Sequence, residues 1–132
     1  AQLDRVDEFI FNKRNILKKY NQAIIDLQGL SPIPSPKWSF SSSWMSGVQV
    51  DRKIYPNIEK MIKYLNLNNI EAKLFWQNLC KQKPYRKYLH SRTNVTEKIS
   101  KEFIALPCST NLENDKQEWI INKLYEACKV AV

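Results

Sequence analysis

Cys80 and His90 are the two residues of this sequence that could act together as a nucleophile and its base. They lie ten residues apart with a proline between them, whereas thiolate catalysis needs an imidazole held beside the sulfur. We therefore predict no catalytic pair, and the scattered carboxylates suggest no acid–base pair either. Cys108 and Cys128 are expected to fill core positions, as free cysteine usually does. With one histidine and three cysteines that lack CxxC spacing, the sequence also predicts no metal site.

The positive charge of the chain is concentrated in its middle. Lys and Arg number 21 against 13 Asp and Glu, which gives a net charge of +8 over 132 residues. Between Arg52 and Glu102, twelve basic residues stand against four acidic ones, and the flanking segments hold nine of each sign. Residues 81–88 interleave cations with two tyrosines, a mixture that binds phosphate or nucleic acid through charge and stacking. A solvated loop that only maintains solubility would have the same composition, so both interpretations stay open.

The other residues that could form a binding site are the four tryptophans. Trp44 lies among serines in a predicted strand, and Trp76 ends another strand just before a polar loop. Aromatic side chains at strand ends beside polar loops often line pockets, although core packing is an equal alternative. Trp119 lies at helical spacing and is expected in the core, whereas Trp38 beside the proline run fits either role.

The first half of the chain predicts a helix, a proline-rich connection, a strand and a second helix. Apolar residues recur at steps of three and four from residue 3 to residue 27, and Gly29 supplies the usual left-handed cap. Three prolines at 32–36 forbid a helix there. Residues 38–50 alternate with period two, which predicts a strand in which Gly47 marks a bulge or a close backbone approach. Its expected inner face is Phe40, Trp44, Val48 and Val50, and a short helix at 58–65 follows.

The second half predicts two more strands and two more helices. We expect a strand at 70–76, a loop or short helical turn to Gln82, a helix at 95–104 and a strand at 104–108. The last helix is expected at about 114–130, with this buried face: Trp119, Ile120, Leu124, Ala127 and Val130. The predicted fold class is α+β, a short sheet packed with about four helices in one domain. No apolar run is long enough to span a membrane and no signal peptide is evident, so we expect a cytoplasmic protein without membrane contact.

Four segments, in order, resemble the DegT/StrS-type sugar aminotransferases. Ala1–Ile10 with Lys13-Arg14, Tyr20 and residues 27–30 is similar to the helix that follows the large domain in that family. Residues 43–50 look like the first strand of its small domain. The stretch from Lys73 to Tyr85 is similar to its Arg-Pro-x-Trp-x-Pro-x-His-x-Gln-Pro motif, and residues 106–112 resemble its Leu-Pro-Ser-Ser-Thr-x-Leu signature. The resemblance is greatest to the branch that makes 4-amino sugars such as perosamine, bacillosamine or legionaminic acid precursors.

The resemblance implies that residues 1–132 form the small C-terminal domain of an enzyme with the aspartate-aminotransferase (type I) fold. Residues 1–29 would be a long linking helix and residues 30–132 an α+β body. The family binds pyridoxal phosphate (PLP) in a large domain that precedes this segment, so the large domain and its catalytic lysine are expected to be absent here. The resemblance then implies no catalytic and no cofactor-binding residue in this chain, no PLP bound to it, and no transamination by it alone.

The resemblance also implies roles for four residues. Trp44 and Trp76 would form part of the wall of the substrate cleft, Lys73 would offset phosphate charge, and Gln82 would hydrogen-bond a sugar hydroxyl. Two positions depart from the family pattern, since Cys80 stands where the family has histidine and Asn78 where it has proline. The implied partners are the large domain, a nucleotide-linked keto sugar, glutamate as the amino donor, and a second copy in a homodimer.

Two other classes of function remain as alternatives. A small basic α+β module could bind nucleic acid through residues 81–88, with an affinity that falls steeply as salt rises. A scaffold domain without a ligand would lack the large exposed apolar face that a severed small domain should carry.

Overall fold

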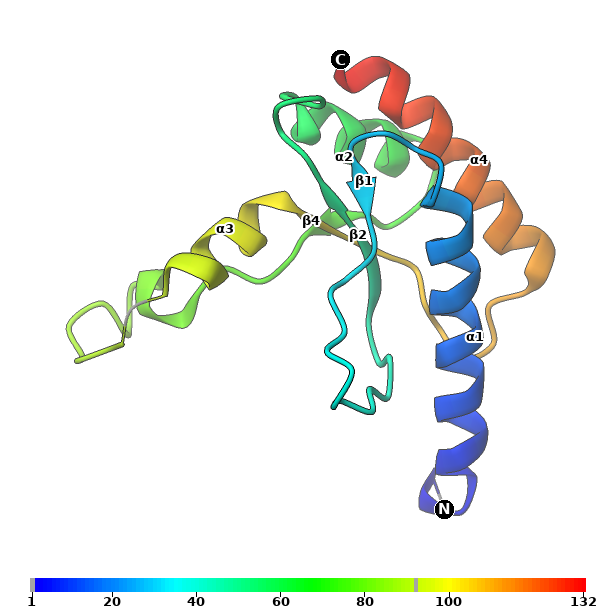
Figure 1. The fold of residues 1–132 in the computed structure, drawn as a ribbon, viewed down its shortest axis with the longest axis horizontal. Helices are drawn as coiled ribbons and strands as arrows, with labels where there is room; N and C mark the ends of the chain where they lie inside the picture. The colour runs from blue at the N-terminus through cyan, green and yellow to red at the C-terminus, as the bar shows by residue number, and fades with distance from the viewer. Residues whose placement is uncertain (1, 92) are drawn as a thin grey trace.

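A computed structural model describes residues 2–91 and 93–132. A short 3₁₀-helix, η1 (Gln2–Arg5), leads into the long helix α1 (Val6–Ile24). The other elements are β1 (Leu30–Ser31), β2 (Ser46–Val50), α2 (Ile58–Leu67), β3 (Lys73–Leu74), η2 (Leu79–Lys81), α3 (Asn94–Glu102), β4 (Phe103–Leu106) and α4 (Asn114–Ala131). The predicted α+β class with a short sheet and four α-helices is confirmed (Figure 1).

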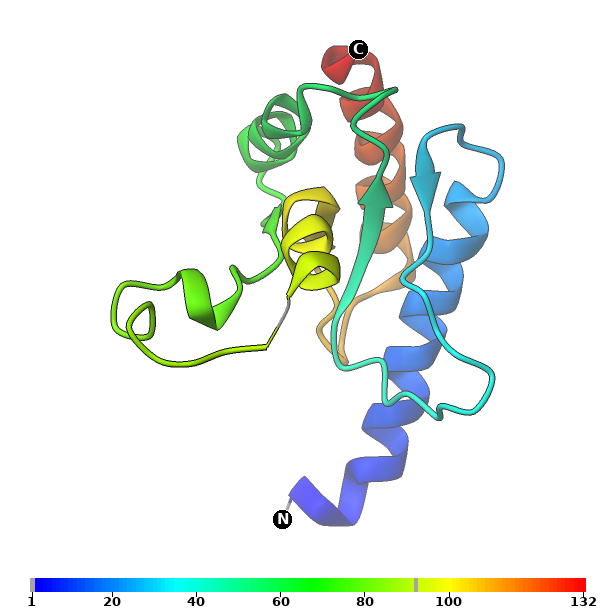
Figure 2. The ribbon, with the colours of Figure 1, turned by 60° about the vertical axis from the view of Figure 1, so that its left-hand side comes forward.

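The strands form one antiparallel sheet in the order β1-β2-β4-β3. β2 pairs with β4 in the register Val48 to Ile104, and both side chains point into the core. Helices α1, α2 and α4 pack on that face, whereas Figures 1 and 2 place α3 on the side of the sheet away from α4. Because side chains alternate along a strand, Gln49 and Phe103 lie on the outer face of the sheet, and Phe103 is buried outside the main core cluster.

Gly29 has the predicted left-handed conformation, with a φ of +86°, which favours glycine. Its predicted role as the helix cap is wrong, because α1 ends at Ile24 and its C-cap is Ile25. At Gly47 the expected close backbone approach is confirmed. A Cβ at Gly47 would lie 2.2 Å from the carbonyl oxygen of Ile104, so β2 approaches β4 too closely there for a side chain.

Two predicted strands are shorter in the structure. Residues 38–45 do not join β2, because the backbone turns at Ser43, whose φ is +53°. Phe40 and Trp44 are therefore exposed and do not share an inner face with Val48. The strand predicted at 70–76 is reduced to Lys73–Leu74, and β1, which has only two residues, was not predicted at all.

The ends of the last helices also differ from the prediction. Ile104 belongs to β4 and not to the preceding helix, and α3 begins at Asn94 after Thr93. In α4, Trp119 is 43% exposed and Val130 is 40% exposed, so both were wrongly assigned to the buried face. The buried residues of α4 are Gln117, Ile120, Ile121, Leu124, Ala127, Cys128 and Ala131.

Candidate functional site

The structure brings Trp44 and Trp76 together. Their rings stack with centroids 5.4 Å apart and an angle of 22° between the planes. Trp44 follows the turn at Ser43, and Trp76 lies two residues after β3. Trp44 remains 61% exposed and Trp76 57% exposed, so the pair offers a broad aromatic surface to solvent.

Two phenylalanines anchor the tryptophan pair to the sheet. Phe75 meets Trp76 edge-on at 5.3 Å and Phe103 edge-on at 5.8 Å. Phe103 is only 2% exposed, so the row of rings runs from solvent to the buried outer face of β4. Edge-to-face and stacked contacts are the favoured geometries of aromatic pairs. The tryptophan pair is therefore packed against the outer face of the sheet through Phe75, and an exposed aromatic face can stack on a nucleobase or a sugar ring.

A cavity of about 430 Å³ lies beside Trp44. Among the described residues, the wall contains no charged side chain and is formed by Leu17, Ile33, Pro34, Ser35, Ser39, Phe40, Ser41, Ser43, Trp44, Met45 and Phe75. Its volume falls in the range of small-molecule pockets. The lining suits an apolar group with a few hydroxyl contacts.

Lys73 and Gln82, the other two predicted site residues, make local contacts. Lys73 Nζ lies 2.8 Å from Glu71 Oε1, and both side chains are largely exposed. The hydrogen bond and charge of Lys73 lower the pKa of Glu71. Gln82 Nε2 donates to the carbonyl of Gln77 over 3.2 Å. Their roles toward a substrate therefore stay predictions, and each would have to exchange its present partner for a ligand.

Asn78 and Cys80, the two residues that depart from the family pattern, are joined in a small hydrogen-bond network. Asn78 Oδ1 accepts hydrogen bonds from the amide and the thiol of Cys80, at 3.2 Å and 3.1 Å. Cys80 Sγ also lies 3.8 Å from Thr93 Oγ1, whose hydroxyl donates to Glu97. His90 Nδ1 instead lies 3.1 Å from the carbonyl oxygen of Ser91. Asn78 and Cys80 thus fix the turn of η2 near the start of α3.

The basic stretch at 81–88 is largely exposed and partly neutralised. Lys81 Nζ lies 3.3 Å from Glu97 Oε1, and Arg86 Nε donates to the carbonyl of Lys81. Tyr85 is 48% exposed and Tyr88 60% exposed. Lys83 and Lys87 are exposed as well, so the stretch keeps a positive surface.

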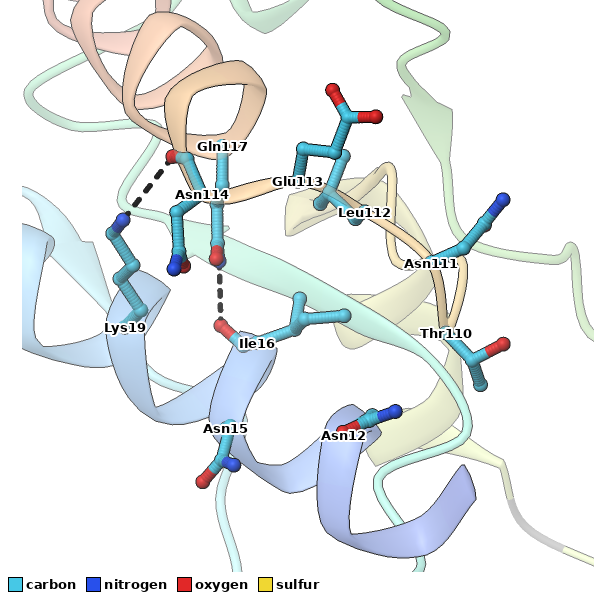
Figure 3. Close-up of a pocket in the computed structure, with 10 residues that line it drawn as sticks. All are labelled: Asn12, Asn15, Ile16, Lys19, Thr110, Asn111, Leu112, Glu113, Asn114 and Gln117. Carbon is cyan, nitrogen blue, oxygen red and sulfur yellow. Dashed lines mark hydrogen bonds between the residues drawn. The ribbon is translucent and has the colours of Figure 1, made fainter. Parts of the chain in front are cut away.

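A second cavity, of about 400 Å³, was not predicted from the sequence (Figure 3). It lies between α1 and the loop that leads into α4, and its lining is Asn12, Asn15, Ile16, Lys19, Thr110, Asn111, Leu112, Glu113, Asn114 and Gln117. Lys19, the cation in its wall, donates to the carbonyl of Asn114 and pairs with Glu118 at 3.0 Å. The Glu113 carboxylate in the wall pairs with Lys116 at 2.9 Å. The other polar groups of the lining are five amides and one hydroxyl, so the cavity is polar.

Neither a buried lysine nor a group of metal-binding side chains occurs among the described residues. A lysine that bonds to PLP must be desolvated, which lowers its pKa, and none of the lysines in the described part of the chain is buried. Lys116 and Lys123 instead have raised pKa values because they donate hydrogen bonds to the carboxylates of Glu113 and Glu126. Within residues 2–91 and 93–132 no group of His, Cys, Asp or Glu could hold a metal ion. Nor does any helix there have the length and apolar character needed to cross a bilayer.

Residues 1–125 match the DegT/DnrJ/EryC1/StrS aminotransferase family. The chain belongs to this family. It is 30% identical over 128 residues to EpsN of Bacillus subtilis strain 168, whose name assigns it to the pyridoxal phosphate-dependent aminotransferases. The match covers 94% of this chain and 32% of EpsN, so the chain spans about a third of the length of this family member.

Solved structures of aminotransferases have the same fold as this chain. The aminotransferase TlmJ from Streptoalloteichus hindustanus matches with a TM-score of 0.83 at 21% identity, over 99% of this chain and 35% of TlmJ. DesI, solved in the presence of its TDP-sugar product, matches with a TM-score of 0.82 at 19% identity, over 96% of this chain and 33% of DesI. These likenesses confirm the predicted fold.

Proposed function

We propose that this chain is the small C-terminal domain of a PLP-dependent aminotransferase that acts on nucleotide-linked keto sugars. The observation that carries the proposal is the family match over residues 1–125. The name of EpsN supports PLP as the cofactor, and the TDP-sugar product of DesI supports a nucleotide sugar as the substrate. The domain alone would catalyse no transamination.

In this proposal α1 is the linking helix and residues 30–132 are the α+β body. A large domain would bind PLP, which supplies the electron sink for amino transfer when it is bound. Because no described lysine of this chain is buried, the lysine that bonds to PLP would also come from the large domain. We further propose glutamate as the amino donor, a homodimeric enzyme, a cytoplasmic location, and a role in making precursors of cell-surface polysaccharides.

Trp44 and Trp76 would form one wall of the substrate cleft. Their stacked rings are exposed and anchored through Phe75, so they would stack on the sugar or the base without losing much conformational freedom. Lys73 would offset the phosphate charge as a point cation. Its exposed pair with Glu71 is worth little and is easily exchanged.

The experiment is a kinetic comparison in the full-length enzyme. Trp76→Ala is expected to raise KM for the nucleotide sugar about tenfold, because one lost stacking contact is worth about 1–3 kcal/mol. The reaction with the amino donor should keep its rate. Trp38→Ala is the matched control, since Trp38 is 88% exposed. If Trp76→Ala and Trp38→Ala give the same KM, the proposed wall is wrong.

A second assay addresses the division of labour between the domains. The isolated chain, mixed with PLP, glutamate and a panel of nucleotide-linked keto sugars, should yield no amino sugar by mass spectrometry. The full-length enzyme should aminate one member of the panel. Amination by the isolated chain would contradict the proposal.

Nucleic-acid binding is the second candidate, because Tyr85 and Tyr88 are exposed among the cations of residues 81–88. It requires saturable binding whose affinity falls steeply with salt. Titration with single-stranded and duplex oligonucleotides at two salt concentrations tests it. Family membership favours the aminotransferase role, so we expect weak binding without saturation.

A further inference from the structure

Trp44 lies at the end of a segment that no strand holds. The segment at residues 40–44 precedes β2, and the structure gives it no strand partner within the described residues. Ser43 in this segment is buried and has a φ of +53°. A left-handed conformation is unfavourable for serine and persists only where the surroundings hold it. Something outside the sheet must therefore fix the segment.

Two consecutive residues of α1 contact both ends of this segment. Arg14 Nε donates to the carbonyl of Ser41 over 2.8 Å, and its guanidinium lies 3.6 Å from the ring centroid of Phe40. Lys13 Nζ donates to the carbonyl of Trp44 over 3.2 Å. One turn of helix thus fixes the backbone on both sides of Ser43.

Lys13 also connects the segment to Cys108, two residues after the end of β4. Its ammonium donates to the carbonyl of Cys108 and lies 3.7 Å from Cys108 Sγ. The thiol of Cys108 donates in turn to the carbonyl of Trp44 over 3.6 Å. Charged donors make stronger hydrogen bonds than neutral ones. Lys13 therefore contributes more than the Cys108 thiol to holding the carbonyl of Trp44.

We infer that Lys13 and Arg14 are positioning residues that hold Trp44 in its stack with Trp76. Without them the 40–44 segment would lose these hydrogen bonds to α1 and the contact of Arg14 with Phe40, and Ser43 could relax to an ordinary conformation that moves Trp44. The importance of this arrangement for substrate binding rests on the proposed function. The positioning itself does not.

Fluorine NMR of the chain labelled with fluorotryptophan tests the positioning. The four tryptophans give four resonances, assigned by single Trp→Phe variants, and stacking displaces those of Trp44 and Trp76 by ring currents. Lys13→Met and Arg14→Met should each abolish that displacement. The resonances of Trp38 and Trp119 should stay in place.

Two variants of α1 serve as controls. Lys13→Arg keeps a charged donor and should retain the displaced resonances. Lys18→Met removes an exposed lysine of the same helix and should retain them as well. The inference is overturned if Lys13→Met leaves the displacement intact. It is also overturned if all four resonances move together, because Lys13 would then support the whole fold and not Trp44 in particular.

Kinetics of the full-length enzyme separate this inference from the proposed function. Lys13→Met should raise KM for the nucleotide sugar severalfold at unchanged rate with the amino donor, and Lys13→Arg should restore KM. If the NMR displacement is lost while KM stays the same, the positioning holds and the proposed contact of Trp44 with the substrate is wrong.

Discussion

Gln117 of α4 donates a hydrogen bond from its side-chain amide to the main-chain carbonyl of Ile16 in α1, over 2.8 Å. Gln117 is only 2% exposed, so this bond joins the two helices at a buried contact beside the polar cavity. Burial of a polar group is tolerable when the group is hydrogen-bonded. The pair thereby fixes α4 against the helix that carries Lys13 and Arg14.

Gln117→Leu should lower the free energy of unfolding by about 1 kcal/mol, because it removes the hydrogen bond but keeps the packing. Gln117→Ala should cost about 2–4 kcal/mol, since it also leaves a cavity. Urea unfolding measures both, and the exposed Gln22→Leu in α1 is the control. Equal costs for the two Gln117 variants would contradict this account of the site.

The same residue explains why the face of α4 was partly mispredicted. A search for apolar residues at helical spacing selects Trp119 and Val130. It misses Gln117, a polar residue that can be buried because it donates a hydrogen bond to the carbonyl of Ile16. The inner face of α4 instead includes Gln117, Ile120, Ile121 and Leu124. Such a partner lies 101 residues away in the sequence, so spacing within one helix carries no information about it.

The candidate site was predictable in its parts and not in its geometry. Strand-end position identified Trp44 and Trp76, but their stacking depends on the left-handed turn at Ser43 and on contacts from α1. The polar cavity at the start of α4 was missed because its asparagines come from two distant segments without a shared pattern. Both features depend on contacts between segments that are far apart in the sequence, so no local sequence pattern predicts them.

Gly47→Ala should destabilise the chain by about 3 kcal/mol or more, because the new Cβ would meet the backbone of β4 at 2.2 Å and a backbone cannot easily yield. Ser46→Ala at the neighbouring position is the matched comparison, because it should not lower the free energy of unfolding. Ser46 is fully buried, and its hydroxyl has no hydrogen-bond partner within the described residues, so its removal should be neutral or stabilising by about 1 kcal/mol. Thermal unfolding of both variants checks the contrast, and a tolerated Gly47→Ala would refute the close approach.

Asn66→Ala should destabilise the chain by about 1–2 kcal/mol. The side-chain amide of Asn66 donates to the carbonyl of Ala72 and accepts from its amide, both at 3.0 Å, in place of a strand partner. This local pairing is also why β3 begins only at Lys73. Asn15→Ala, in exposed helix, controls for the higher helix propensity of alanine. Asn66→Asp should be at least as harmful, because it loses the donor; a neutral Asn66→Asp in urea unfolding would contradict the paired geometry.

Stability should fall at alkaline pH through Tyr55. Burial, and then the neighbouring Cys128, raise the pKa of Tyr55 from 10.0 to about 12, and its hydroxyl donates to the carbonyl of Gln28 over 3.0 Å. Above pH 10 the unfolded chain loses this proton while the folded chain keeps it, so the unfolded state binds fewer protons and the free energy of unfolding decreases. The contribution is complete below pH 10 and is lost between pH 10 and about 12.

Tyr55→Phe removes this titration and should reduce the slope of unfolding free energy against pH by up to about 1.4 kcal/mol per pH unit in that window. Burial also raises the pKa of Tyr20, with the neighbouring Cys108 as a second cause, so part of the alkaline loss should survive in the Tyr55→Phe variant. Tyr85→Phe, at an exposed position, should leave the slope unchanged. Urea unfolding at several pH values from neutral to alkaline measures the three profiles. Identical slopes for wild type and Tyr55→Phe would mean that the Tyr55 hydroxyl is as free to ionise in the folded chain as in the unfolded one.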